Sequence, residues 1–185
     1  MRKFFSSIFL TAGFLCFLTT GFLVWQRNDP GRLKFELDEV GAVEIGEKEV
    51  LPLFISIPGQ KNELPIYLSS IRDSKWETTT RGVSLLSASA VPGETGNSII
   101  YGHNWSNLLG SLANVGPGDE ILIFYSNGDE KVFDVRFVQE VDPSNVSVLE
   151  ETDDKRLTIY TCSGFLDRKR LVVTAFLRED QDGQI

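Results

Sequence analysis

The chain begins with an uncharged apolar run and continues as short hydrophobic stretches separated by turns. Residues 4–25 hold 22 positions without a charge. At about 1.5 Å per residue, a helix of that length crosses the roughly 30 Å hydrocarbon core of a bilayer. A cleaved signal peptide has a shorter apolar run and a small-residue cleavage site, and no such site is evident near Trp25. We therefore expect an uncleaved transmembrane signal anchor at 4–25, after a cytoplasmic tip at 1–3.

Residues 26–49 are polar and punctuated by glycine, which is typical of a linker or stalk with room for a short helix. Basic residues lie on both sides of the anchor, so the charge bias alone does not fix its orientation. Long domains translocate largely regardless of charge. We therefore expect residues 26–185 on the outer face of the membrane.

From residue 50 onward, β-rich runs alternate with turn signals, and no βαβ rhythm or internal repeat is visible. The sequence Asn127-Gly128 between two such runs predicts a tight hairpin, because both central positions of that turn need a positive φ. Short helices are expected only at 107–115 and 69–76. Roughly eight short strands indicate a closed barrel or a sandwich over 50–178, followed by a tail at 179–185. The predicted strands are 50–57, 64–68, 85–88, 98–101, 120–126, 131–141, 157–161 and 170–177.

Charge and composition exclude some functions. The chain has 18 basic and 26 acidic residues and a net charge of −8, and without a basic stripe such a chain makes a poor phosphate-backbone binder. A single histidine and two distant cysteines cannot build a four-ligand structural zinc site. Four acidic residues gather just before the strand predicted at 157–161. Such oxygen ligands suit calcium, although a solvated acidic loop is the favoured interpretation. These residues are Glu150, Glu151, Asp153 and Asp154.

Cysteine use points to one residue. Cys16 lies in the anchor, so Cys162 is the only cysteine in the exported part. An unpaired cysteine there is either an intermolecular bridge or a reactive thiol, and the alternative is a buried inert side chain.

Three chemically capable side chains fall at predicted strand ends. His103 ends one apolar run, Cys162 ends another, and Arg170 opens the next strand. If the last two strands form a hairpin, Cys162 and Arg170 lie at the same end of the sheet. A thiolate is a strong nucleophile, an imidazole can transfer protons, and a guanidinium can stabilise charge developing on a carbonyl oxygen. Together they point to acyl transfer.

These residues carry a family resemblance. Thr158-Ile159-Tyr160-Thr161-Cys162 is similar to the TLxTC motif of sortases, with Ile159 in place of Leu. The sequence from Asn97 to His103 resembles the approach to the GH motif, and Arg170-Leu171-Val172-Val173 resembles the arginine strand. The resemblance covers roughly 50–178 and extends to the order His, Cys, Arg and to the N-terminal anchor. It implies an all-β fold: a closed eight-stranded barrel with one or two short helices after one transmembrane helix.

The resemblance also implies roles and partners, without assigning a subclass. Cys162 would attack the Thr–Gly bond of an LPxTG-like sorting signal on an exported protein, His103 would serve as general acid and base, and Arg170 would stabilise the oxyanion. Arg168 is a rival for the arginine role, but it sits in the predicted turn. The thioester acyl-enzyme would pass to an amine from peptidoglycan or from a pilin lysine. No cofactor is required, although some sortases use calcium.

Rival enzyme classes fit less well. Papain-like proteases place Cys before His, caspase-like enzymes need a Q-A-C-x-G motif and a βαβ pattern, and chymotrypsin-like cysteine proteases need a G-x-C-G type loop. L,D-transpeptidases need an S-H-G-C motif around the cysteine. Another exported thiol peptidase or acyl-transferase, and a membrane-anchored barrel that only binds a partner, remain alternatives. Replacement of Cys162 would separate them, because only an enzyme would lose turnover.

Overall fold

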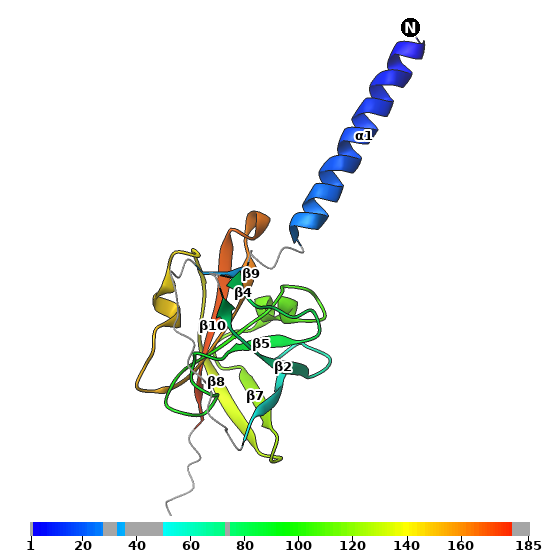
Figure 1. Ribbon diagram of the computed structural model, residues 1–185. Coiled ribbons are helices and arrows are strands. Elements are labelled where there is room, and N and C mark those ends of the chain that lie inside the picture. The colour runs from blue at the N-terminus through cyan, green and yellow to red at the C-terminus, as the bar shows by residue number, and fades with distance from the viewer. Residues whose placement is uncertain (1, 28–32, 36–49, 73–74, 179–185) are drawn as a thin grey trace, which may run out of the picture.

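A computed structural model describes residues 2–27, 33–35, 50–72 and 75–178. The first element is the helix α1, Arg2–Arg27, which projects away from the remainder of the fold (Figure 1). Its segment Phe9–Gln26 is long and apolar enough to cross a membrane, and none of it is buried inside the protein. This segment coincides with most of the predicted anchor and is a candidate membrane span.

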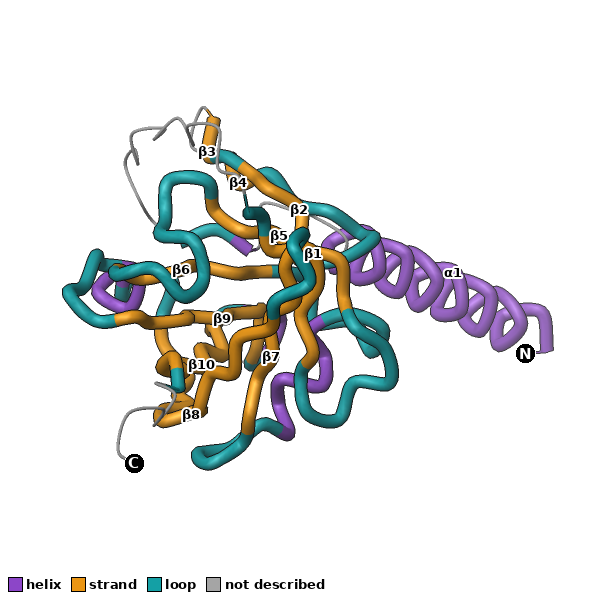
Figure 2. Tube along the Cα trace, turned by 90° about the horizontal axis from the view of Figure 1, so that it is seen from below, coloured by secondary structure: helices purple, strands orange, loops and turns teal. Residues whose placement is uncertain are grey.

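Eight strands close into a barrel, as predicted (Figure 2). Their order around the barrel is β1-β2-β5-β6-β9-β10-β8-β7. The pairs β2–β5 and β6–β9 are parallel, and the others are antiparallel. The strands are β1 (Pro52–Ser56), β2 (Leu64–Ser69), β5 (Val83–Leu86), β6 (Gly96–Tyr101), β7 (Glu120–Tyr125), β8 (Glu130–Val141), β9 (Lys155–Ser163) and β10 (Lys169–Leu177). Each predicted strand overlaps one of these.

The barrel carries apolar side chains on both of its faces. Alternate residues point to opposite sides of a strand, so Ile159 joins the interior cluster while its neighbour Tyr160 joins a second cluster outside the barrel wall. The outer cluster includes Ile99, Tyr101 and Val172. Packing on both faces explains why all residues of β6 and most residues of β9 are buried, rather than every second one.

The predicted hairpin at Asn127-Gly128 is confirmed, and it joins β7 to β8. The turn differs from the expected one, because Gly128 has a positive φ of +89° whereas Asn127 does not have a positive φ. The helix expected at 107–115 is present as a 3₁₀ helix, η2, Leu109–Asn114. Two further 3₁₀ turns were not predicted: η3, Val146–Leu149, and η4, Phe165–Asp167.

The helix expected at 69–76 is wrong. The chain there forms the end of β2 and a small hairpin of β3, Ile71–Arg72, and β4, Lys75–Trp76. The reason is tertiary: the indole of Trp76 packs edge-on against the rings of Tyr101, at 5.1 Å, and Tyr160, at 5.9 Å. Burial of a large aromatic ring outweighs the weak local preference for helix.

The expected linker at 26–49 falls mostly outside the described residues, as do residue 1 of the tip and the whole tail at 179–185. Its described part differs from a free stalk. Leu33 and Phe35 are buried, and the Phe35 ring meets Tyr160 edge-on at 4.8 Å. A short piece of the chain between α1 and the barrel therefore packs on the outer cluster.

Candidate active site

Strand β9 holds Cys162 between the other two predicted site residues. In the antiparallel β9–β10 pair, Cys162 lies directly opposite Arg170, and directly opposite residues point to the same face of a sheet. In the parallel β6–β9 pair, Tyr101 lies opposite Tyr160. His103 and Cys162 each follow two residues later on their strands, so they come level at the same end of the barrel. The structure thus brings His103, Cys162 and Arg170 to one place.

All three side chains are removed from bulk water. The exposed fractions are 6% for Cys162, 6% for His103 and 3% for Arg170. Electrostatic interactions are stronger in such surroundings than in water. Arg168, the rival arginine, is exposed in the loop between β9 and β10.

A hydrogen bond fixes the two backbone units that carry the thiol and the imidazole. The hydroxyl of Thr161, just before Cys162, donates to the carbonyl of Gly102, just before His103, at 2.7 Å. Thr161 is buried. This hydrogen bond links the two segments beyond the last β6–β9 ladder pair, Tyr101 and Tyr160.

The imidazole of His103 stacks on an aromatic neighbour and lies within the electrostatic influence of a carboxylate. Its ring stacks on that of Trp105, with centroids 4.6 Å apart and planes inclined by 11°. Burial lowers the pKa of His103, because it disfavours the charged form, and the negative charge of Asp167 partly opposes this. Asp167 also accepts a hydrogen bond from the Asn104 amide at 3.4 Å. The neutral imidazole is therefore favoured, with Asp167 available to stabilise the cation.

The guanidinium of Arg170 is fixed by backbone carbonyls. Its Nη1 donates to the carbonyls of Asp167, at 3.0 Å, and Lys169, at 2.9 Å, and its Nη2 donates to the carbonyl of Lys34 at 2.8 Å. The charged carbon lies 6.0 Å from the centre of the Phe35 ring. Nε is buried and has no hydrogen-bond partner among the described residues. One N–H of an otherwise immobilised cation is thus available for a ligand.

Tyr160 supplies a second buried polar atom without a hydrogen-bond partner in the described part of the chain. Burial raises the pKa of Tyr160 well above its ordinary range; the nearby charges of Tyr101 and Cys162 raise it further, and that of Arg170 opposes them. The phenol therefore stays protonated and can donate. An unpaired buried donor costs about 1–3 kcal/mol unless something binds it, so a ligand with oxygen acceptors would be favoured beside Cys162.

A mainly apolar cavity of about 250 Å³, whose lining also includes Asn97, Glu150 and Glu151, opens on the same outer face. Ile99 of β6 lines it, four residues before His103 along the chain, and the opposite wall comes from η3 and the residues after it. Four residues of extended chain span roughly 13 Å. The rings of Phe35 and Trp76 pack on Tyr160 beside this path.

Sequence reasoning missed three participants. Trp105 stacks on His103, and its position two residues after the histidine is the signal that could have found it. The Asp167 charge and the Lys34 carbonyl reach the site through tertiary contacts, and no sequence motif marks them.

The acidic loop offers no visible metal centre. Asp154 pairs with Arg156 at 2.7 Å and accepts a hydrogen bond from Thr152 at 2.8 Å. In the ranges that the structure describes, no three His, Cys, Asp or Glu side chains gather as metal ligands do. The expectation about calcium stays untested.

The fold and site define an eight-stranded barrel with a Cys–His–Arg cluster at one end, and comparisons identify the family. Residues 55–178 match the model of the sortase domain. The chain is 31% identical over 143 residues to sortase A of Bacillus anthracis, a match that covers 76% of this chain and 65% of that protein. The chain belongs to the sortase family, whose members are cysteine transpeptidases.

Solved structures agree with this assignment. Sortase A from Corynebacterium diphtheriae superposes with a TM-score of 0.60 at 29% identity, covering 72% of this chain and 63% of that one. Sortase C1 from Streptococcus agalactiae superposes with a TM-score of 0.61 over 80% of this chain and 81% of that one, and its 19% identity supports the fold alone. The matches to the two sortase A proteins span less than two thirds of their lengths.

Proposed function

We propose that this protein is a membrane-anchored sortase-type transpeptidase on the outer face of a bacterial membrane. It would cleave an LPxTG-like sorting signal of exported proteins and join them to an amine of peptidoglycan or of a pilin. The observation that carries the proposal is the convergence of His103, Cys162 and Arg170 at one end of the barrel. Membership of the sortase family and the candidate membrane span support it.

In the first step, the thiol of Cys162 passes its proton to the neutral imidazole of His103, and the sulfur attacks the carbonyl carbon of the Thr–Gly peptide bond. The carbon–nitrogen bond breaks, and His103 gives a proton to the departing amine. The product is a thioester between Cys162 and the threonine. An acceptor amine then attacks the thioester carbon, His103 takes a proton from that amine, and the thiolate leaves. His103 is thus the general acid of one step and the general base of the other.

Arg170 would stabilise the oxygen that becomes negative in each tetrahedral intermediate. Its Nη atoms are bound to three carbonyls while Nε has no partner among the described residues, so the cation is held in place before substrate arrives. Preorganised donors of this kind contribute roughly 10²–10³-fold in rate.

The apolar cavity supports an extended peptide as donor substrate. Because Ile99 precedes His103 by four residues along one chain, a side chain in the cavity would lie about four residues before the bond at Cys162. That spacing matches the leucine of an LPxTG-like signal. The aliphatic side chains of Leu86, Ile99 and Leu149 in the lining suit an aliphatic side chain of the substrate.

The test is product analysis with peptides that contain LPxTG and its variants, using the full chain in detergent micelles. The proposal predicts cleavage after Thr, a ligated product that depends on an added amine such as triglycine, and neither product with Cys162→Ala. Arg170→Lys keeps the charge but changes the donor geometry, and its kcat/KM should fall about 10²-fold. Cleavage that yields only the hydrolysed acid with every amine tried would point to a peptidase instead.

A further inference from the structure

The loop between β9 and β10 presents an apolar tip to solvent. Phe165 is 80% exposed and Leu166 is 37% exposed. Among the described residues outside α1, Phe165 is the most exposed of the large hydrophobic side chains. Leu166 and Asp167 have positive φ values of 55° and 56°, which non-glycine residues adopt at a cost. The fold therefore exposes most of the Phe165 side chain and part of the Leu166 side chain to solvent.

Hydrogen bonds place this tip next to the chain that leads from the membrane helix. Arg170 donates from Nη1 to the carbonyl of Asp167 and from Nη2 to the carbonyl of Lys34, so the loop and the Lys34 segment meet at one guanidinium. Lys34 follows Arg27, the last residue of α1, by seven residues. A fully extended chain of that length spans roughly 25 Å, which limits how far the loop can lie from the end of α1.

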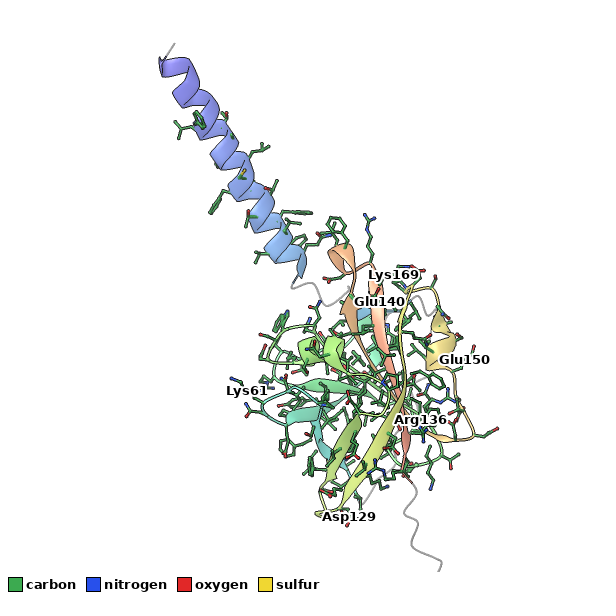
Figure 3. The ribbon with its side chains drawn as sticks, turned by 180° about the vertical axis from the view of Figure 1, so that it is seen from behind. Lys61, Asp129, Arg136, Glu140, Glu150 and Lys169 are labelled. Carbon is green, nitrogen blue, oxygen red and sulfur yellow. The ribbon has the colours of Figure 1, made fainter. Side chains whose placement is uncertain are left out.

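Two views of the molecule, Figure 1 and Figure 3, show at which end of the barrel the loop lies. The β9–β10 loop projects from the end of the barrel that faces α1 (Figure 1). Lys169, the first residue of β10, is labelled at that end, while Asp129 of the β7–β8 turn lies at the opposite end (Figure 3). If α1 crosses the bilayer, the apolar tip is on the membrane side of the barrel.

Basic residues flank the tip although the chain as a whole carries a net charge of −8. Arg168 is exposed and Lys169 is partly exposed, its ammonium 2.9 Å from Asp142. The segment that leads from α1 contributes Arg27, Arg32 and Lys34 by sequence. Segments that bind the surface of an anionic membrane typically combine apolar side chains with cationic ones.

We infer that the β9–β10 loop is a second membrane contact, in which Phe165 and Leu166 enter the acyl-chain boundary and Arg168 meets anionic headgroups. The catalytic end of the barrel would then rest on the bilayer. The inference rests on the part of the proposed function that places α1 across the membrane, and it is independent of the transpeptidase chemistry. It predicts that sorting signals are cleaved close to the lipid surface.

The test places a tryptophan at the tip and measures its quenching by lipid. Full-length Phe165→Trp is reconstituted into vesicles of phosphatidylcholine and phosphatidylglycerol with brominated acyl chains. Phe137→Trp is the matched control, because Phe137 is 60% exposed in β8 and lies opposite Thr174, four residues along β10 from Arg170. Spectra of the unmodified chain are subtracted to remove Trp25, Trp76 and Trp105.

We expect the added emission at 165 to be blue-shifted and quenched at least threefold more than that at 137. Arg168→Gln should reduce the quenching at 165 and leave that at 137 unchanged. Equal quenching at the two positions would overturn the inference. A blue shift that persists in detergent and grows with protein concentration would also overturn it, because a second copy would then cover the tip.

Failure of the anchor is detected separately. Flotation of the unmodified chain with vesicles, and quenching of its Trp25, report whether α1 is inserted. If neither occurs, the inference fails together with the proposed localisation. If both occur but Trp at 165 is quenched no more than Trp at 137, only the second contact is refuted.

Discussion

The bond between Thr161 and Gly102 allows the alignment of the thiol and the imidazole to be tested by one substitution. Thr161→Val removes the hydroxyl that donates to Gly102 at 2.7 Å while nearly preserving the side-chain shape. Thr158→Val is a matched control on the same strand, because Thr158 is also buried and donates to Asn97 of β6 at 2.6 Å. Asn97 lies near the start of β6, far from His103 along the strand.

The two substitutions should cost similar stability. Each leaves one buried acceptor without its donor, which costs about 1–3 kcal/mol. For a domain of this size, the midpoint of thermal unfolding falls by about 4 °C per kcal/mol, so we expect losses of roughly 4–12 °C for both variants. Circular dichroism of the full chain in detergent measures this directly.

Activity should separate the two variants. Only Thr161 joins the backbone units next to Cys162 and His103, and misplacing reacting groups by about 1 Å costs up to 10²-fold in rate. We expect kcat at saturating peptide to fall at least about tenfold for Thr161→Val and less than about threefold for Thr158→Val, measured by peptide ligation. We compare kcat because Asn97, the partner of Thr158, lines the cavity proposed to bind the peptide. Equal losses in the two variants, at equal loss of stability, would refute the view that this bond aligns the site.

Four further predictions concern individual side chains. His103 is the only histidine, so a single NMR titration of its ring should give a pKa below the usual range, and Asp167→Asn should lower it further because the opposing charge is lost; an unchanged or higher pKa in the variant would contradict the role of Asp167. Because the pKa of His103 is lower in the folded chain, the unfolded chain binds a proton more readily than the folded one. The contribution of His103 to the free energy of unfolding is therefore present above the ordinary imidazole pKa and is lost as the pH falls through the folded pKa. A stability–pH curve that is the same for His103→Gln would exclude this. A Cβ at residue 82 would lie 2.1 Å from the carbonyl oxygen of Pro65, whereas at Gly116 nothing lies within 4 Å, so Gly82→Ala should cost at least about 2 kcal/mol and Gly116→Ala little, in thermal unfolding. The ring of Phe35 packs edge-to-face on Tyr160 beside the path from the cavity to Cys162, and the prediction is that a bound peptide displaces it. Such a contact is worth about 0.5–1.5 kcal/mol, so Phe35→Ala should lower the donor-peptide KM by roughly two- to tenfold. A KM that stays the same or rises would show that the ring does not compete with substrate.

The strands and the three site residues can be predicted from the sequence because local signals mark them. Asn127-Gly128 predicts its hairpin by turn chemistry alone, and Cys162, His103 and Arg170 each stand at the boundary of an apolar run. Their convergence depends on the parallel pairing of β6 with β9. That pairing joins segments far apart in the chain and is suggested only by the family resemblance.

The features that sequence reasoning missed are those decided by distant contacts. Residues 69–76 were expected to be helical because nothing local shows that Trp76 will be buried against Tyr101 and Tyr160. Leu33 and Phe35 lie in a polar stretch that is typical of a linker, yet both are buried on the barrel. Burial of a few large side chains determines the conformation of such segments, and the residues that cover those side chains lie far away in the sequence.

The most direct test of the account is the mass of the covalent intermediate. The full chain in detergent is mixed with an LPxTG-like peptide without an acceptor amine, quenched in acid, and measured intact by mass spectrometry. The account predicts an added mass equal to the peptide up to its threonine. Peptide mapping should place it on Cys162, and hydroxylamine should release it as expected for a thioester. Cys162→Ala should carry no adduct, and His103→Ala should accumulate far less. Turnover of the peptide without an adduct, or an adduct on any other residue, would contradict the account.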